Sequence, residues 1–241
     1  MNILFATDLD NTLMYSHVHR KPDDVCVEHL NGKEQGFMSK SVYEALPYIS
    51  KHIDIIPITT RSMEQFDRIK FPDNIITRAF IANGAFDYNT RTGDMTKTFI
   101  HLPDYIDELD RIYNILKNDP RTRITNHVDD SYVYASFNSN EIANEVSASI
   151  SSFIAPVVSN RKLYYIPAYY TKKAAIRKIK HDYDLVISAG DSELDIDMLN
   201  EADIAIIPKE LNSYIKTNTL VCPDNMRLSD YVILCLLNKI E

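Results

Sequence analysis

Runs of mainly apolar residues, each ended by polar residues, recur along the first third of the chain. They cover residues 3–6, 53–58 and 79–82. A continuous run of this length is typical of a parallel strand that is buried on both faces. Stretches with helical spacing separate the runs, so the order of strand, helix, strand, helix and strand predicts a doubly wound parallel sheet.

Beyond residue 83 the pattern changes to short strands joined by turns. The polar stretch at residues 89–94 is a hairpin turn signal. Apolar residues at helical spacing predict two helices, one from residue 103 and one after residue 139. This mixture is typical of an α+β module with an antiparallel sheet. We expect its strands within residues 86–99, 122–128 and 132–137, and near residues 157 and 164.

The parallel pattern returns in the last third of the chain. A helix over residues 171–181 precedes apolar runs at residues 184–189 and 204–207. We therefore predict a Rossmann-like α/β core with an α+β domain inserted between its two halves. The predicted core comprises residues 1–83 and 165–241, and the predicted insert comprises residues 84–164.

One long polar segment, residues 15–38, follows the first strand. Turn signals within it predict a hairpin between residues 25–28 and 35–38. We expect this hairpin to lie over the end of the strand and to cover part of a ligand pocket. A helix is expected from Ser39, with Pro47 kinking or splitting it.

Composition narrows the class of protein. The chain has 241 residues, of which 45% are apolar and 25% charged, which excludes a disordered or collagen-like chain. A net charge of −8 without a basic block argues against a nucleic-acid partner. We see neither a membrane helix nor a signal peptide. The three cysteines are scattered without metal-type spacing, so we expect a cytoplasmic protein. The oligomeric state is left open.

Two carboxylates end the first apolar run. Asp8 and Asp10 are two residues apart and should project to the same side of the strand end. This is the edge where open α/β sheets bind ligands. Because two crowded carboxylates repel each other, the pair invites a cation, a shared proton, or both. A simpler reading is that the two residues only end the strand and start a turn.

Three further clusters follow strands or open helices. Thr59 ends the second apolar run and suits a phosphate oxygen or a plain helix cap. Lys172 opens a helix, where a positive charge is unfavourable unless anions lie nearby. Asp191 and Asp195 lie four apart after another strand. Together with Asp8 and Asp10 they would place a formal charge of about −4 at one sheet edge, which calls for a cation. Oxygen ligands favour Mg²⁺ over zinc.

In this order, the motifs resemble those of the haloacid-dehalogenase (HAD) superfamily. They are Asp8-Leu9-Asp10-Asn11-Thr12, the strand-ending Thr59, Lys172 in Lys172-Lys173-Ala174-Ala175-Ile176, and Gly190-Asp191 with Asp195. The insert and Asn83-Gly84-Ala85 are similar to the Cof-like and sucrose-phosphatase-like branch, which has a type-two cap domain.

The resemblance implies a role for each of these residues. Asp8 would be the nucleophile that forms an aspartyl-phosphate, and Asp10 would be the general acid and base. Thr59 and Lys172 would bind the phosphoryl group. Mg²⁺ would be held by Asp8, the backbone carbonyl of Asp10, and Asp191, with Asp195 supporting from the flank. Candidate substrate contacts are Asn11, Thr60 and Arg61, together with cap residues such as Arg123 and His127.

The chain departs from the family pattern at three positions. Asn11 and Thr60 stand where glycine is usual, and Leu194 stands where asparagine is usual. Asparagine tolerates the turn conformation that the glycine adopts. Threonine should stiffen its loop. Leu194 removes a polar group near the metal, so we expect weaker or altered Mg²⁺ binding that depends more on Asp195.

The sequence therefore predicts a Mg²⁺-dependent phosphatase that acts on a small phosphorylated metabolite, such as a sugar phosphate, with the cap selecting the substrate. Two alternatives stay open. A phosphomutase on the same fold would transfer phosphate within a sugar. The other is a non-catalytic phosphate- or metal-binding module. Phospho-receiver domains, which are modules of this kind, use similar residues in a different order along the chain, and they lack both a cap and an aspartate at the position of Asp10.

Overall fold

The computed structural model of the protein describes residues 1–99 and 103–240. The chain forms two compact units. The core unit comprises residues 1–96 and 172–241, and the inserted unit comprises residues 97–171. Both ends of the inserted unit lie later in the chain than those of the predicted insert. We propose that the inserted unit is the cap; the predicted domain boundaries stay a prediction.

A parallel sheet organises the core unit, as the apolar runs predicted. Within the described residues its five strands run in the order β15-β14-β13-β1-β5, with every neighbouring pair parallel. Leu4 and Ala6 of β1 are fully buried, which explains the continuous apolar run. The strands are β1 (Ile3–Thr7), β5 (Asp54–Pro57), β13 (Leu185–Ala189), β14 (Ile204–Ile207) and β15 (Asn218–Val221).

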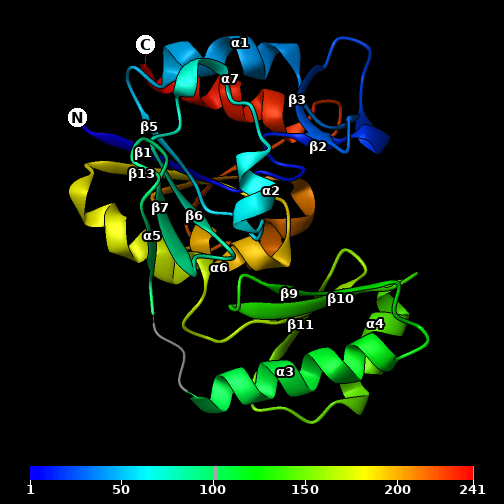
Figure 1. Ribbon diagram of the computed structural model, residues 1–241. Helices are drawn as coiled ribbons and strands as arrows, with labels where there is room; N and C mark the ends of the chain where they lie inside the picture. The colour runs from blue at the N-terminus through cyan, green and yellow to red at the C-terminus, as the bar shows by residue number, and fades with distance from the viewer. Residues whose placement is uncertain (100–102, 241) are drawn as a thin grey trace. The chain divides into compact units, whose positions relative to one another are not determined.

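Helices cover both faces of this sheet, which confirms the doubly wound arrangement (Figure 1). On one face lie α1 (Lys40–Ile49) and α7 (Leu228–Ile240). On the other lie α5 (Lys172–Ile179) and α6 (Ile196–Leu199), whose apolar side chains pack with Leu4 and Ala6.

The expected split of α1 at Pro47 is wrong. The helix continues from Lys40 to Ile49, and Ser39 caps its start as expected. Because Pro47 lies in the last turn, only one helical hydrogen bond is lost there.

The third apolar run forms β6 (Arg78–Ile81), which meets the end of the β5 segment through one parallel bridge between Ile58 and Phe80. It continues into an antiparallel sheet with β7 (Phe86–Asn89) and β8 (Met95–Lys97). The hairpin expected in the insert thus pairs with a core strand. The short helix α2 (Met63–Asp67) lies between β5 and β6 in sequence and begins with a capping box at Ser62.

The predicted hairpin of the long polar segment is confirmed. It is formed by β3 (Val25–Leu30) and β4 (Lys33–Met38), with β2 (Tyr15–Ser16) on the other side of β4. The register shifts on both sides of Glu28, so the hairpin contains bulges.

The inserted unit is an α+β layer, as the sequence predicted. Its antiparallel sheet has the order β11-β12-β10-β9. One face packs on the helices α3 and α4 through a core that includes Leu116, Val133 and Phe137. The elements are α3 (Pro103–Asn118), β9 (Ile124–Val128), β10 (Tyr132–Ser136), α4 (Asn140–Ser149), β11 (Pro156–Ser159) and β12 (Lys162–Tyr165).

Short 3₁₀ segments join these elements. They are η1 (His17–His19), η2 (Pro72–Asn74), η3 (Lys180–Asp182), η4 (Glu193–Asp195) and η5 (Lys209–Tyr214). None of the helices in the described part of the chain has both the length and the apolar character needed to cross a membrane.

Leu116→Ala should destabilise the inserted unit by about 2–5 kcal/mol, because the side chain is fully buried and its removal leaves a cavity. Ile115→Ala, next to it but 38% exposed, should change the stability by less than about 1 kcal/mol. Urea titration followed by hydrogen exchange of residues 103–165 measures both. Equal losses for the two variants would contradict the predicted core.

Candidate functional site

A buried lysine joins two aspartates at the carboxyl edge of the parallel sheet. Asp8 directly follows β1, and Lys172 is the first residue of α5. The Lys172 ammonium lies 2.5 Å from Oδ1 of Asp8 and 2.6 Å from Oδ1 of Asp195. All three side chains are buried. The structure therefore brings together residues from three distant parts of the sequence.

Asp195 is fixed by the turn that follows β13. Its second oxygen, Oδ2, accepts hydrogen bonds from the backbone N–H groups of Asp191 and Ser192 and from the Ser192 hydroxyl. Gly190 makes room for this carboxylate, because a Cβ there would lie 2.6 Å from Cγ of Asp195. Both oxygens of Asp195 thus have protein partners, and its position depends on a residue without a side chain.

Asp191 lies beside this pair, at the partly exposed mouth of the cluster. Its Oδ2 accepts a 3.3 Å hydrogen bond from the Asn11 side chain. Asn11 has a φ of 58°, the turn conformation in which asparagine replaces the usual glycine at little cost. Oxygens of Asp8, Asp191 and Asp195 lie within 4.8 Å of one another.

Burial and mutual repulsion perturb the acids of this cluster. Desolvation by burial raises the pKa of Asp8 to about 7, against the opposing attraction of Lys172. Burial, with added repulsion from Asp8, raises the pKa of Asp191 to about 8. Burial alone would lower the pKa of Lys172, but the carboxylates of Asp195 and Asp8 outweigh it and raise that pKa. When its three acids are ionised, the cluster holds three carboxylates against the one ammonium of Lys172.

The donor chemistry of this cluster fits a divalent cation of the Mg²⁺ type. Carboxylate oxygens are the ligands that such hard cations prefer. Asp8 and Asp191 carry the raised pKa values that a bound cation would lower. Asp195 is less available, since its oxygens already bind Lys172 and the backbone. Leu194, which stands in place of the usual asparagine, is half-buried in η4.

Asp10, whose charge repels the Asp8 carboxylate, is held by an arginine. Its side chain is 48% exposed, and both of its oxygens are bound by one side of the Arg61 guanidinium, at 2.9 and 2.8 Å. Such a two-point contact fixes the orientation of both groups. Arg61, a candidate substrate contact from sequence, is 11% exposed at its side chain and is engaged with protein carboxylates.

Thr59 is fully buried at the start of the loop that carries Arg61. Its hydroxyl accepts a 3.2 Å hydrogen bond from the Arg61 backbone N–H, and its own N–H is donated to the carbonyl of Phe80. Thr60 is half-buried and does not adopt a positive φ, so glycine is not needed at that position.

Sequence reasoning missed Glu28, a fully buried carboxylate from the hairpin that binds both Arg61 and Arg68. Strand alternation would expose either Glu28 or its neighbour Val27, yet each is only 1% exposed. The bulge at this point breaks the alternation. Gly36, which pairs with Glu28, was the available signal, because glycine within a strand often marks a close approach.

A second group of potential metal donors lies on the same hairpin. Oxygen, nitrogen and sulfur atoms of Cys26, His29 and Glu34 lie within 4.8 Å of one another. Glu34 and His29 are exposed, and Glu34 already forms a 2.7 Å ion pair with Arg20.

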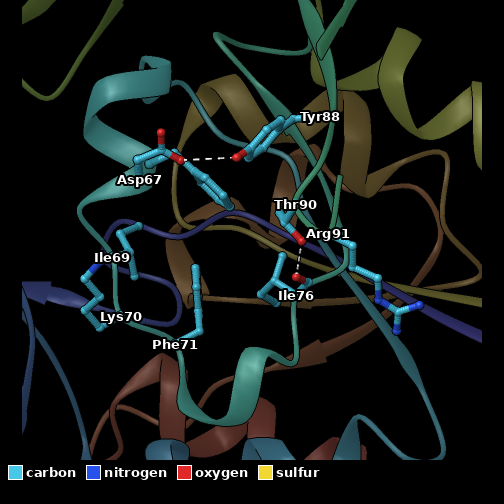
Figure 2. A pocket seen from close by; sticks show the side chains of 9 residues that line it. Asp67, Ile69, Lys70, Phe71, Ile76, Tyr88, Thr90 and Arg91 are labelled. Atoms are coloured by element: carbon cyan, nitrogen blue, oxygen red, sulfur yellow. Dashed lines mark hydrogen bonds between the residues drawn. The ribbon is translucent and has the colours of Figure 1, made fainter. Parts of the chain in front are cut away.

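The core unit also contains a pocket of about 530 Å³, formed around Phe66 and Asp67 at the end of α2. Figure 2 shows the hydroxyl of Tyr88 directed toward Asp67, at 3.5 Å. None of the aspartates at the sheet edge lines this pocket. Its lining residues are Phe66, Asp67, Ile69, Lys70, Phe71, Ile76, Tyr88, Thr90 and Arg91.

Comparison with known proteins gives no match to a family model and no match to a curated protein sequence. Solved structures do match. The sucrose-phosphatase of Synechocystis sp. PCC6803, in complex with sucrose and phosphate, has a TM-score of 0.66 at 12% identity, with 99% of this chain and 98% of that chain covered.

Two further structures are similar over nearly the whole chain. A HAD subclass IIB sugar phosphatase has a TM-score of 0.63 at 18% identity, covering 96% of this chain and 98% of that one. A trehalose-6-phosphate phosphatase related protein has a TM-score of 0.62 at 15% identity, covering 98% of each chain. The chain therefore shares the fold of these structures, a parallel α/β core with an inserted α+β unit.

Proposed function

We propose that this protein is a Mg²⁺-dependent phosphatase that hydrolyses a sugar phosphate, or a similar small phosphomonoester, through an aspartyl-phosphate on Asp8. The observation that supports this most is the contact of Lys172 with both Asp8 and Asp195 at the carboxyl edge of the sheet. A buried ammonium in this position offsets the negative charge of the nucleophile and can bind a phosphoryl oxygen.

In the first half-reaction, a carboxylate oxygen of Asp8 attacks phosphorus. The bond between phosphorus and the ester oxygen breaks, and Asp10 donates a proton to the leaving oxygen. Lys172 holds the other oxygen of Asp8, so the attacking oxygen is oriented before substrate binds. The Thr59 hydroxyl lies on the same loop as Arg61 and would bind the phosphoryl group.

In the second half-reaction, Asp10 takes a proton from water. The oxygen of that water attacks the phosphorus, the bond to Asp8 breaks, and inorganic phosphate leaves. Asp8, Asp191 and the backbone carbonyl of Asp10 would hold Mg²⁺, which supplies positive charge beside the phosphoryl oxygens. Asp195 supports the arrangement by holding Lys172.

The choice of a sugar phosphate as substrate class draws on the fold comparison. Structures similar over the full length include a sucrose-phosphatase with bound sucrose and phosphate and a subclass IIB sugar phosphatase. The proposed partner is accordingly a small phosphate ester, and a phosphomutase remains the second outcome that the assay below separates.

Asp8→Asn should lower phosphate release by about 10³-fold or more, because the amide cannot act as the nucleophile. The measurement is release of inorganic phosphate from a panel of sugar phosphates with Mg²⁺. Asp197→Asn, an exposed aspartate on α6, is the matched control and should retain activity. Equal turnover by wild type and Asp8→Asn would contradict the proposal, and an isomerised sugar phosphate without free phosphate would indicate a mutase.

Mg²⁺ should stabilise the protein more at about pH 8 than at about pH 5, because its ligands must lose their protons. The folded pKa values of Asp8 and Asp191, about 7 and about 8, lie above the ordinary 3.8. Between these values the folded protein holds protons that the unfolded chain has released, so the metal-free protein loses stability as the pH rises from about 4 to about 8.

Thermal unfolding with EDTA and with Mg²⁺ at both pH values measures this dependence. In Asp191→Asn, most of the increase in Tm that Mg²⁺ causes at the higher pH should be lost. The decrease in Tm of the metal-free protein between the lower and the higher pH, measured in EDTA, should also be smaller than in wild type. An equal shift in Tm at the two pH values would contradict the proposed ligands.

Gly190→Ala should displace the Asp195 carboxylate, since the new Cβ would lie 2.6 Å from its Cγ. We expect a loss of stability of about 1–3 kcal/mol and a loss of activity of about tenfold or more. Gly93→Ala is the control: its φ of 78° strains an alanine, but nothing lies within 4 Å, so it should cost stability alone. Full activity in Gly190→Ala would contradict the role of Asp195.

A further inference from the structure

The hairpin of β3 and β4 places a buried carboxylate, Glu28, against Arg61, which is the residue that holds Asp10. The register passes from the pair Cys26–Phe37 to the pair Glu28–Gly36, which leaves Val27 as an extra residue. Glu28 also forms an antiparallel bridge with Ile69, just beyond α2. Bulges of this kind redirect a side chain, and they are frequent next to active sites.

Space for this carboxylate exists only because Gly36 has no side chain. A Cβ at Gly36 would lie 2.8 Å from Oε2 of Glu28, 3.0 Å from its Cβ and 2.5 Å from Cε of Met14. The opposite strand is thus shaped around Glu28. A buried carboxylate needs compensating charge, which two arginines provide.

Arg61 and Arg68 supply that charge from two sides. Oε2 of Glu28 lies 3.0 Å from the Arg61 guanidinium, and Oε1 lies 3.1 Å from Nε of Arg68. Arg68 also contacts Glu64, whose side chain is 85% exposed. Among the three carboxylates in these described ion pairs, those of Asp10, Glu28 and Glu64, Glu28 contacts both Arg61 and Arg68.

Arg61 is held along its whole guanidinium. Nε and Nη2 bind the two oxygens of Asp10, Nη2 also binds Glu28, and Nη1 donates to the carbonyl of Gln65. A planar group with acceptors on both edges cannot rotate without breaking bonds on each. The orientation of Asp10 therefore depends on Glu28, through Arg61.

We propose that Glu28 is a positioning residue for the general acid–base step: it holds one edge of the Arg61 guanidinium so that the other edge orients the Asp10 carboxyl group toward the leaving oxygen. This inference rests on the proposed phosphatase function. It assigns the hairpin a part in proton delivery, in addition to the pocket cover expected from sequence.

The inference predicts a dependence on the leaving group. When the phosphorus–oxygen bond of a phosphate ester breaks, a basic leaving oxygen needs the proton from Asp10, whereas a weakly basic one leaves as the anion. The probes are 2,4-dinitrophenyl, 4-nitrophenyl and phenyl phosphate, whose phenolates increase in basicity in that order. The kcat/KM values report the first half-reaction alone, up to the aspartyl-phosphate.

In Glu28→Gln, kcat/KM for phenyl phosphate should fall by about 10–100-fold, while that for 2,4-dinitrophenyl phosphate stays within about twofold of wild type. Glu64→Gln removes a carboxylate from Arg68 without touching Arg61, so it is the matched control and should change neither value. Equal losses on all three esters would mean a merely structural role and would overturn the inference, as would no loss on any of them.

If Glu28→Gln does not fold, the double variant Glu28→Gln, Arg68→Gln removes one charge of each sign from the buried cluster and replaces Glu28 by the same uncharged group. It should show the same leaving-group dependence, and a wild-type profile would overturn the inference. If wild type turns over these esters and neither variant loses kcat/KM for phenyl phosphate, the role of Glu28 is refuted, whereas the proposed function is not. No phosphate release by wild type from these aryl esters or from the panel of sugar phosphates refutes the proposed function, and this inference with it.

Discussion

The contact of one buried ammonium with two carboxylates determines how the core unit must be built. Lys172 is 2% exposed and lies at the first residue of α5, where the helix dipole disfavours a positive charge. Desolvation also disfavours it. The Asp8 and Asp195 carboxylates, at 2.5 and 2.6 Å, offset both costs. The ends of β1 and β13 and the start of α5 are consequently tied together by charge as well as by apolar packing.

The parallel sheet makes this convergence possible. β1 and β13 are neighbours, and their register ends at the pair Thr7–Ala189, so Asp8 and Gly190 follow directly at the same edge. In the sheet, β5 lies on one side of β1, and the later strands β13, β14 and β15 lie on the other side. β1 is thus the point at which the strand order reverses, where open α/β sheets form a crevice beyond their carboxyl ends. Topology alone brings acids more than 180 residues apart in sequence to one place.

The sequence was sufficient for those features that continuous patterns specify. The apolar runs predicted the parallel strands, except that the run at residues 79–82 forms β6, which pairs with the antiparallel β7 and meets the β5 segment through one parallel bridge. The short motifs predicted that Lys172 comes together with Asp8, Asp191 and Asp195. Asp10, which was expected with them, binds Arg61 instead. The hairpin was predicted, but its bulge was not, because the burial of Glu28 beside Val27 breaks the alternation on which strand predictions rest. Arg61 was considered a substrate contact since a single sequence does not show that Asp10 and Glu28 lie on either side of it. Contacts that depend on irregular backbone geometry cannot be predicted from the periodicity of apolar and polar residues.

Asp8 and Asp10 are two residues apart, yet their surroundings differ in the way that the proposed reaction requires. Asp8 is 5% exposed and contacts a lysine, which suits a nucleophile that must be oriented and protected from water. The side chain of Asp10 is 48% exposed, so it can exchange protons with solvent, and an arginine orients it. Different environments for neighbouring carboxylates are how one site separates a nucleophile from an acid. Here the sheet edge provides the first environment, and the hairpin with α2 provides the second.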